Sequence, residues 1–283
     1  MALVLTTQAS SNGAAATTSS LQVIIPAGSL VVVGVVGSPQ TSDVTGITDD
    51  AVGGSNSYGA ATSAKGSTNS TNDLFSNIWY CSNSKAAWTI TVTVTAASTI
   101  GAIFVWVFAN AGAGALDVAS AVAHDTAAAT LAGPAITTAQ ADEVICAICA
   151  YTDGVASASG TYASSCVVVA NGHSGAFSIK TGTVSSEVCT WTDVGTGAGA
   201  CSSAAFKSVL ITIEQEGFLF RNDDNNEASA TGIAAQDAGI TNKPVNTNVR
   251  LRALLNSTND TPSKAYQLEY RKVGGTAWHK IHA

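Results

Sequence analysis

Charged side chains are scarce in this 283-residue chain, at 11% of residues, whereas soluble domains usually have about a quarter. Arginine is absent from residues 1–209, which contain four lysines and eleven acids and therefore carry the whole net charge of −7. An acidic surface without arginine does not suit the phosphates of nucleic acid, so we expect no nucleic-acid partner. The low charge also suggests that neighbouring subunits cover much of the surface, as in a homo-oligomer or a larger assembly.

Long apolar segments are missing as well. The longest run, "IGAIFVWVFANA" from Ile100, is well below the ~20 residues that a membrane-spanning helix needs, so we expect no membrane partner. The first residues, "MALVLTTQASSNG", lack the basic start of a signal peptide, and their apolar stretch is too short. We therefore expect a protein that is made in a cytoplasm and stays there until assembly or lysis.

Motifs for catalysis are also lacking. No Gly-rich phosphate loop precedes a helix and no H-E-x-x-H occurs. The segment 172–176 approaches G-x-S-x-G, but Ala176 occupies the fifth place and a strand-like run follows where the motif needs a helix. The acids Asp49-Asp50 and Asp142-Glu143 are adjacent in sequence and should point apart on a strand or turn, whereas a catalytic acid pair must converge on one bond. The sequence predicts that the protein is not an enzyme.

Cysteine is present without a metal-binding pattern. One C-x-x-C occurs, in "VICAICA", but its surroundings predict a strand, where residues three apart face opposite sides. We expect buried structural thiols, and one or more disulfides remain an alternative. The six cysteines are Cys81, Cys146, Cys149, Cys166, Cys189 and Cys201.

Short Val/Ile runs separated by Ser, Thr, Gly and Ala predict β-strands throughout. Residues 88–96, "WTITVTVTA", alternate with a period of two, and residues 99–111, "TIGAIFVWVFANA", are apolar on both faces, as in a central strand. We expect residues 73–83 to form a hairpin with 88–96. About ten such segments, with turns every 8–12 residues, indicate an all-β fold with an antiparallel β-sandwich of Ig-like or jelly-roll-like type.

The composition changes near Leu210. Residues 210–283 contain eight basic and eight acidic residues, in contrast to the acidic first part. In this tail "NVRLRALLN" and "AYQLEYRKV" alternate in polarity, which predicts a second, smaller C-terminal β-sandwich domain. The start of the chain is of low complexity. We therefore divide the chain into an N-terminal arm (1–20), a β-sandwich domain (21–210) and a small β domain (211–283).

The densest polar cluster lies in "FLFRNDDNNEASATGIAAQD", residues 218–237. Counted from Asp224 as an EF-hand loop, Ala228 fails the fifth place and Ser229 replaces the required glycine. A solvated turn between strands is one interpretation, because Asp and Asn bond their own backbone. The other is a looser Ca²⁺ site formed by Asp223, Asp224 and Glu227, and we expect no other cofactor.

Parts of the sequence resemble modules of phage structural proteins. Residues 20–210 resemble a β-sandwich module of phage and metagenomic structural proteins, through "NIWYCSN", "ITVTVTA", "ALDVASA", "ITTAQADEV" and "SSAAFKSV". Ala115 stands where that module has proline. Residues 214–283 resemble a second module of marine phage-type proteins, through "GFLFRNDDNNEASATGIAAQDAGIT", "VRLRALLNSTND" and "YQLEYRKVGGTAW".

The resemblance implies a location in the virion and no catalytic site. It favours capsid decoration or a head fibre, with the major capsid protein or a tail protein as partner, and a tail or tail-fibre accessory protein is the alternative. A carbohydrate-binding or adhesin module for host attachment is a further alternative, because sandwich domains often carry exposed aromatic loops. Its candidate platforms for a host surface glycan are Tyr58, Trp191 and Trp278.

Overall fold

The computed structural model describes residues 3–12, 16–39, 44–66, 74–94, 99–151, 157–158, 162, 167–169, 173–208, 212–222, 224, 230–240, 242, 248–258, 269–270 and 279–280. Within these ranges the protein is nearly all β, with antiparallel sheets and no α-helix, which confirms the predicted all-β, sandwich-like class. The chain divides into two compact units, Met1–Leu210 and Ile211–Ala283, and the division lies in the region where the charge composition changes.

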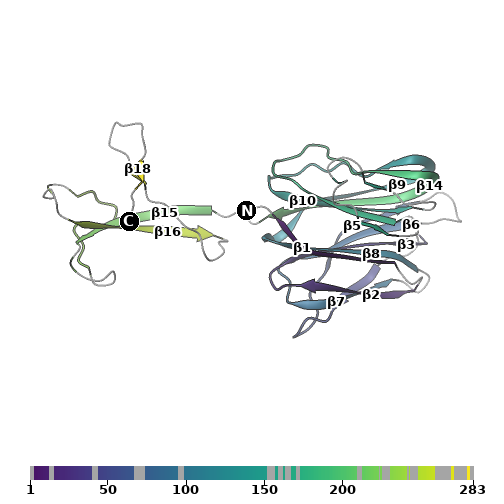
Figure 1. Cartoon of the computed structure of the whole chain (residues 1–283), viewed down its shortest axis with the longest axis horizontal. Helices are drawn as coiled ribbons and strands as arrows, with labels where there is room; N and C mark the ends of the chain where they lie inside the picture. The colour runs from purple at the N-terminus through teal and green to yellow at the C-terminus, as the bar shows by residue number, and fades with distance from the viewer. Residues whose placement is uncertain are drawn as a thin grey trace. The chain divides into compact units, whose positions relative to one another are not determined.

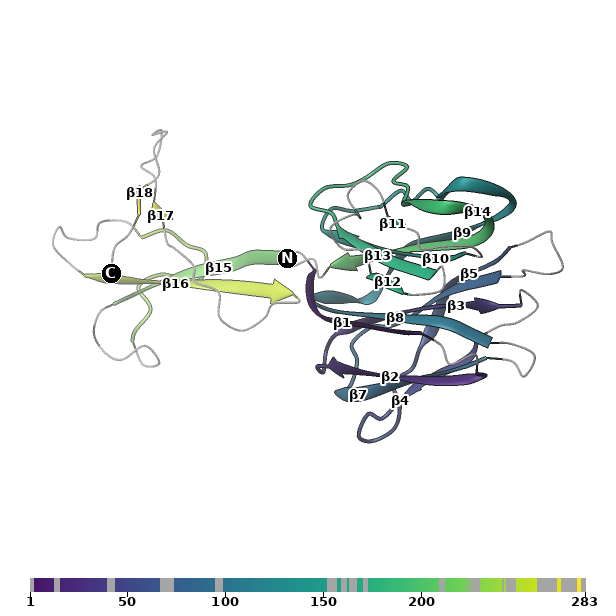
Figure 2. The same cartoon turned by 45° about the vertical axis from the view of Figure 1, so that its right-hand side comes forward.

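The first unit contains three antiparallel sheets, which we name A, B and C. Sheet A has the order β1 (Val4–Asn12), β8 (Thr99–Ala109), β3 (Leu30–Ser38), β6 (Leu74–Cys81), β5 (Gly59–Gly66). Sheet B has the order β2 (Thr18–Ile25), β7 (Ala87–Val94), β4 (Val44–Asp49). Sheet C has the order β11 (Ser157–Ala158), β14 (Thr190–Ser208), β10 (Glu143–Tyr151), β13 (His173–Ile179), β12 (Val167–Val169), and β9 (Ala111–Ala132) also pairs with β14. Figures 1 and 2 show sheet A as the middle layer, between B and C.

The middle position of sheet A follows from side chains that are apolar on both faces. Successive residues of a strand point to opposite sides, so a strand that is apolar at every position needs a packing partner on each side. In β8, one set of alternate residues, Phe104, Trp106 and Phe108, packs toward sheet C, and the other, Ile103, Val105 and Val107, packs toward sheet B. The predicted two-faced central strand is thereby confirmed.

Two apolar cores fill the spaces between the layers. The A/C core contains Leu30, Val32, Val36, Ile78, Phe104, Trp106 and Phe108 of sheet A, with Val144, Cys146, Ile148, Phe177 and Phe206 of sheet C. The A/B core contains Val31, Val33, Val35, Phe75, Ile103, Val105 and Val107 of sheet A, with Val23, Ile25, Val44, Ile47, Ile90, Val92 and Val94 of sheet B. A third cluster lies on the far face of sheet C and includes Ile145, Cys149, Tyr151, Tyr162, Cys189, Trp191 and Cys201.

The predicted hairpin of 73–83 with 88–96 is wrong. Strand β6 pairs with β3 and β5 in sheet A, whereas β7 pairs with β2 and β4 in sheet B. The physical reason is visible in their burial patterns. Residues 74–78 of β6 are buried at every position, which requires the middle layer, whereas β7 buries only alternate residues and suits an outer layer.

The segment expected to be an N-terminal arm is part of the folded sheets. Residues Val4–Asn12 form β1, which pairs antiparallel with β8 at the edge of sheet A. Residues Thr18–Ile25 form β2, which pairs with β7 in sheet B. The low-complexity sequence therefore forms an edge strand of sheet A. Its small polar residues suit such a strand, because part of an edge strand remains exposed to water.

The second unit contains two antiparallel ladders, one of β15 (Thr212–Asn222) with β16 (Val249–Thr258) and one of β17 (Glu269–Tyr270) with β18 (His279–Lys280) (Figure 2). The predicted second sandwich is not seen among the residues described for this unit, which form these two ladders. Val249 and Leu251, apolar residues of the alternating segment "NVRLRALLN", are 39% and 40% exposed.

Candidate functional site

The predicted calcium loop contains one described acidic residue, Asp224, while Asp223 and Glu227 lie outside the described residues. The exposed Asp224 carboxylate accepts hydrogen bonds from the backbone N–H and the hydroxyl of Thr231. These bonds lower the pKa of Asp224. Its oxygens thus close the loop back onto the chain, as in the turn interpretation. Among the residues with a described placement, no group of three or more His, Cys, Asp or Glu could hold a metal ion.

The chain after this loop returns along β15. The backbone N–H of Ile233 donates to the carbonyl of Phe220 at 2.9 Å, and the N–H of Asp237 donates to that of Phe218 at 2.8 Å. The Asp237 carboxylate in turn accepts from the N–H of Phe218 at 2.8 Å. A shallow groove beside this segment is lined by Phe218, Leu219, Gln236 and Arg252. The acidic stretch therefore begins a tight return of the chain against the aromatic strand.

The three predicted glycan platforms have different outcomes. Trp191 is only 1% exposed and belongs to the cluster on the far face of sheet C, so its prediction as a stacking surface is wrong. Tyr58 is partly buried against the A/B core, and its hydroxyl donates to Asp49 at 2.8 Å. Trp278 lies outside the described residues. The local sequence around Trp191 does not show whether other parts of the chain cover its ring, and here residues such as Leu131 and Tyr162 pack with it.

The loop 49–58 of the first unit is held by a network of hydrogen bonds centred on Asp49. The Asp49 carboxylate accepts hydrogen bonds from the backbone N–H of Ala51 and Asn56, the side-chain amide of Asn56 and the hydroxyl of Tyr58. Burial alone would raise the pKa of Asp49, but these hydrogen bonds outweigh it and the net shift is downward. Asn56 also bonds both backbone groups of Lys85, so the loop is fixed to the segment that leads into β7.

The fixed loop and the start of β7 each expose one large apolar side chain to solvent. Val52, within the loop, is 94% exposed, and Trp88, in β7, is 51% exposed. The Asp50 carboxylate accepts from the backbone N–H of Trp88 at 2.7 Å and of Thr89 at 2.9 Å, which ties the two segments together. We name Val52 and Trp88 the apolar tip. The sequence predicts turn residues at Asp49-Asp50 but does not distinguish Trp88, because the exposure of Trp88 depends on where β7 lies in the sheet.

Two carboxyl groups and a lysine meet across three neighbouring strands of sheet C. Glu143 on β10 is directly opposite Lys207 on β14, and the Lys207 ammonium lies 3.0 Å from the Asp117 carboxylate of β9. The Asp117 carboxylate also accepts from the backbone N–H of Ala139 at 2.7 Å. Burial, followed by the negative charge of Asp117, raises the pKa of Glu143 to about 7. Burial alone would raise the pKa of Asp117, but the bonds from Ala139 and Lys207 lower it.

Asp142 and Glu143 are adjacent in sequence, but in the structure the carboxyl group that interacts with Glu143 is that of Asp117, 26 positions earlier in the chain. The two carboxyl groups are not an accessible acid pair. The Glu143 side chain is fully buried, so a substrate cannot reach it without opening the sheet. The cluster can hold one proton between two carboxyl groups and link three strands. Sequence alone missed it because Asp117 and Lys207 become neighbours only through long-range pairing.

The histidine and serine of the G-x-S-x-G-like segment lie in a strand. His173 begins β13, and Ser174 is fully buried in the same strand, while residues 170–172 are outside the described ranges. The Nδ1 atom of His173 accepts from the backbone N–H of Tyr151 at 3.5 Å. Burial lowers the pKa of His173 to about 4. A neutral histidine and a buried serine inside a sheet do not form a nucleophile elbow.

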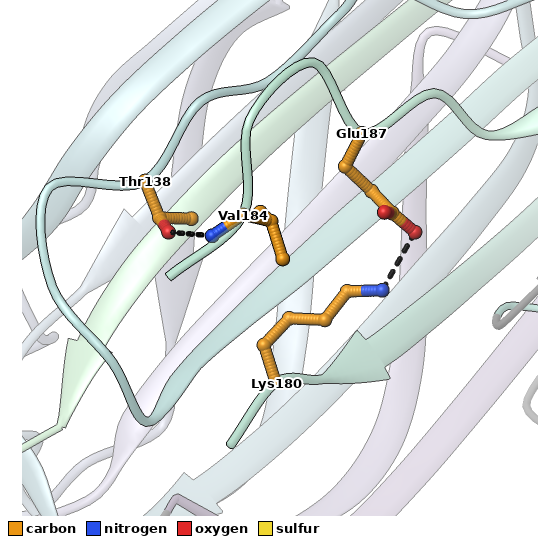
Figure 3. A network of polar contacts seen from close by, with 4 residues as sticks. All are labelled: Thr138, Lys180, Val184 and Glu187. Atoms are coloured by element: carbon orange, nitrogen blue, oxygen red, sulfur yellow. Dashed lines mark hydrogen bonds and ion pairs between the residues drawn. The ribbon is translucent and has the colours of Figure 1, made fainter. Parts of the chain in front are cut away.

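A second polar network joins the loops at the end of sheet C (Figure 3). The Lys180 ammonium lies 2.6 Å from the Glu187 carboxylate and 5.3 Å from the centre of the Tyr162 ring. The Thr138 hydroxyl accepts from the backbone N–H of Val184 at 3.0 Å. Glu187 and Ile136 also form an isolated antiparallel bridge. These contacts fasten the connection after β13 to the segment before β10, and they indicate a structural role.

The comparisons with known proteins add no relative. The chain has no match among protein-family models, curated proteins or solved structures. In the described part of the chain, no helix is both long enough and apolar enough to span a membrane. Among the residues whose placement the structure describes, the apolar tip combines the most exposed large apolar side chain, Val52, with an exposed tryptophan, and we take it as the candidate contact surface.

Proposed function

We propose that this chain is a non-enzymatic structural protein of a bacteriophage particle, acting as capsid decoration, cement or head fibre through protein–protein contacts. The observation that carries the proposed mechanism is the apolar tip, in which the exposed Val52 of the loop 49–58 and the exposed Trp88 of β7 belong to two segments that hydrogen bonds of Asp50 join. The phage assignment rests on the resemblance of both parts of the sequence to modules of phage structural proteins. The same resemblance is compatible with the alternative of a tail or tail-fibre accessory protein.

A fixed apolar loop suits docking. Ordering a mobile loop on binding weakens association, whereas a preformed loop avoids that loss. Tryptophan supplies a large contact area with few rotatable bonds, and it is enriched among residues that dominate interface energies. The proposed partner is a major capsid or tail protein, or a further copy of this chain. The proposed location is the virion, after synthesis in the host cytoplasm.

Mass spectrometry of purified particles tests the location. Peptides of this chain are expected at an amount comparable to other structural proteins and should remain after washing in high salt. Their absence from purified particles would overturn the proposal.

A variant series tests the contact surface. Replacing both Val52 and Trp88 by serine should lower the number of copies per particle by at least about tenfold, because a buried tryptophan anchor contributes about 2 kcal/mol or more. The matched control is Val4→Ser, since Val4 is 52% exposed at the edge of sheet A. Equal occupancy by the tip variant and the control would exclude this surface.

The exposed ring of Trp88 also favours a second candidate, a module that binds a host surface glycan. An accessible aromatic face is what a sugar ring stacks on, and Trp88 is more accessible than Tyr58 or Trp191. A glycan array with the full chain and with Trp88→Ala separates the two. Binding of a defined glycan that is lost in the variant supports the second candidate, and an array without hits removes it.

A further inference from the structure

Two cysteines of sheet C lie face to face. Cys149 of β10 and Cys201 of β14 are direct partners in the antiparallel register. Both are fully buried in the cluster on the far face of the sheet. Their sulfur atoms are 2.9 Å apart, with the Cys201 thiol positioned to donate to Cys149. Ordinary packing contacts between side-chain atoms lie nearer to about 4 Å, so this pair is unusually close.

The register meets the geometric requirement for a disulfide. Residues directly opposite each other in an antiparallel pair have Cα atoms about 4.5–5.5 Å apart. Disulfides join Cα atoms about 4.4–6.8 Å apart, so the Cα separation typical of this register lies within the range that a disulfide needs. The pair is also distinct from the C-x-x-C of the sequence. Cys146 points into the A/C core and Cys149 to the opposite face, as expected for residues three apart in a strand.

We propose that Cys149 and Cys201 are a site of oxidative modification and form a cross-strand disulfide when the protein meets a small-molecule disulfide such as oxidised glutathione. One thiolate attacks the oxidant and releases one glutathione thiol, leaving a mixed disulfide on the protein. The second thiolate attacks that intermediate and releases the second glutathione thiol. Two protein thiols are thereby oxidised, one glutathione disulfide is reduced to two thiols, and the two thiol protons go to the glutathione.

The bond would join two inner strands of sheet C that are far apart in the chain. The cysteines are 52 positions apart, so the link closes a long loop in the unfolded chain and favours the folded state. Because both sulfur atoms are buried, exchange requires local opening of the sheet or occurs while the sheet forms. The cytoplasm keeps such thiols reduced, whereas an extracellular environment permits the bond. The bond would form whether or not the chain belongs to a virion.

The test uses the full chain, unfolded and then refolded in buffer with oxidised and reduced glutathione. We expect an intact mass lower by two hydrogens, a Cys149–Cys201 linked peptide in a non-reducing digest, and a thermal midpoint that falls when dithiothreitol is added. The variant Cys149→Ala/Cys201→Ala should show neither the mass change nor the reductant effect. The control Cys146→Ala lies on the same strand but on the other face, and it should behave like the native chain.

Several results would overturn the proposal: thiols that all remain reduced, a linked peptide that joins other cysteines, or glutathione adducts that persist on Cys149 or Cys201. Circular dichroism reports whether each variant folds. If the double variant does not fold, the digest of the native chain still decides, because it identifies the linked residues directly.

Discussion

The two cores on either side of sheet A are built differently, although the same strands supply one wall of each. The A/C core is rich in aromatic rings, with Phe104 stacked near Trp106 at 6.0 Å and Phe108 against Phe177 at 5.6 Å between ring centres. The A/B core consists mainly of valine and isoleucine from both sheets. Alternation within one strand thus sends large flat side chains to one layer and branched aliphatic ones to the other.

Glycine accompanies the aromatic core. A Cβ atom on Gly175 would lie 2.7 Å from the Phe104 ring, and one on Gly34 would lie 2.6 Å from an Ile148 methyl group. Both glycines allow sheets A and C to approach closely around large side chains. The A/C layer also contains a buried hydroxyl pair, Ser76 and Ser202, at 2.8 Å. The A/C contact thus combines aromatic rings, glycines and a hydroxyl pair, whereas branched aliphatic side chains predominate in the A/B core.

The largest expected effect comes from emptying the aromatic core. We predict that Trp106→Ala destabilises the fold by about 3–5 kcal/mol, whereas Ile103→Val, on the opposite face of the same strand, costs about 0.5–1.5 kcal/mol. The reason is the cavity that a large, well-packed ring leaves behind. Urea unfolding of both variants provides the measurement. A loss well below about 3 kcal/mol for Trp106→Ala would contradict a tightly packed ring in the A/C core.

The second effect concerns how the stability of sheet C depends on pH. Sheet C contains two buried titratable groups, Glu143 and His173, whose pKa values are shifted in opposite directions. The pKa of Glu143 is raised from 4.5 to about 7, so its contribution to stability is complete below pH 4.5 and is lost as pH rises through 7. The pKa of His173 is lowered from 6.5 to about 4, so its contribution is present above pH 6.5 and is lost as pH falls through 4. Between these limits the two trends oppose each other.

We therefore predict that each single variant exposes the other trend. Glu143→Gln should become more stable as pH rises from 4 to 6.5, and His173→Gln should become less stable as pH rises from 4.5 to 7. Each change can reach roughly 3 kcal/mol, because a pKa displaced by one unit corresponds to about 1.4 kcal/mol. Thermal unfolding across this pH range measures both slopes. Parallel slopes in the two variants would contradict the assignment.

A smaller effect tests the close approach of sheets A and C. Gly175→Ala adds a methyl group against Phe104 and should destabilise by about 1–3 kcal/mol. Gly46→Ala in strand β4 of sheet B is the matched control, since a Cβ atom there has nothing within 4 Å. It should be neutral or slightly stabilising, because alanine restricts the unfolded chain. Denaturant midpoints of the two variants compare them, and a neutral Gly175→Ala would show that the layers can separate freely.

The sequence was sufficient for the class of fold and for the character of individual strands. Residues 99–111 predict a strand buried on both faces, and 88–96 predict one with a single buried face, because alternation reports how many sides are covered. Pairing was not predictable in the same way. Strands β6 and β7 are neighbours in the chain but lie in different sheets, and the local pattern, which reports how many faces are covered, does not tell which strands each one pairs with.

The candidate sites also differ in whether their contacts are local in sequence or depend on long-range pairing. Asp224 accepts hydrogen bonds from Thr231, only seven positions later in the chain. Trp191, by contrast, is covered by residues distant in the chain, and Asp117 meets Glu143 and Lys207 only through the pairing of β9, β10 and β14. Exposure of Trp88 likewise depends on its place near the start of β7 in sheet B. Long-range pairing therefore decides which residues are accessible.

Hydrogen exchange of the backbone amides tests the middle position of sheet A most directly. Strand β8 lies between β1 and β3 and is covered on both faces, so its amides should exchange only on global unfolding and as slowly as any in the chain. Amides of β16, whose ladder has half-exposed side chains, should exchange faster. Slow exchange in β8 and faster exchange in β16 is the expected result, and exchange in β8 as fast as in β16 would contradict a doubly covered central layer.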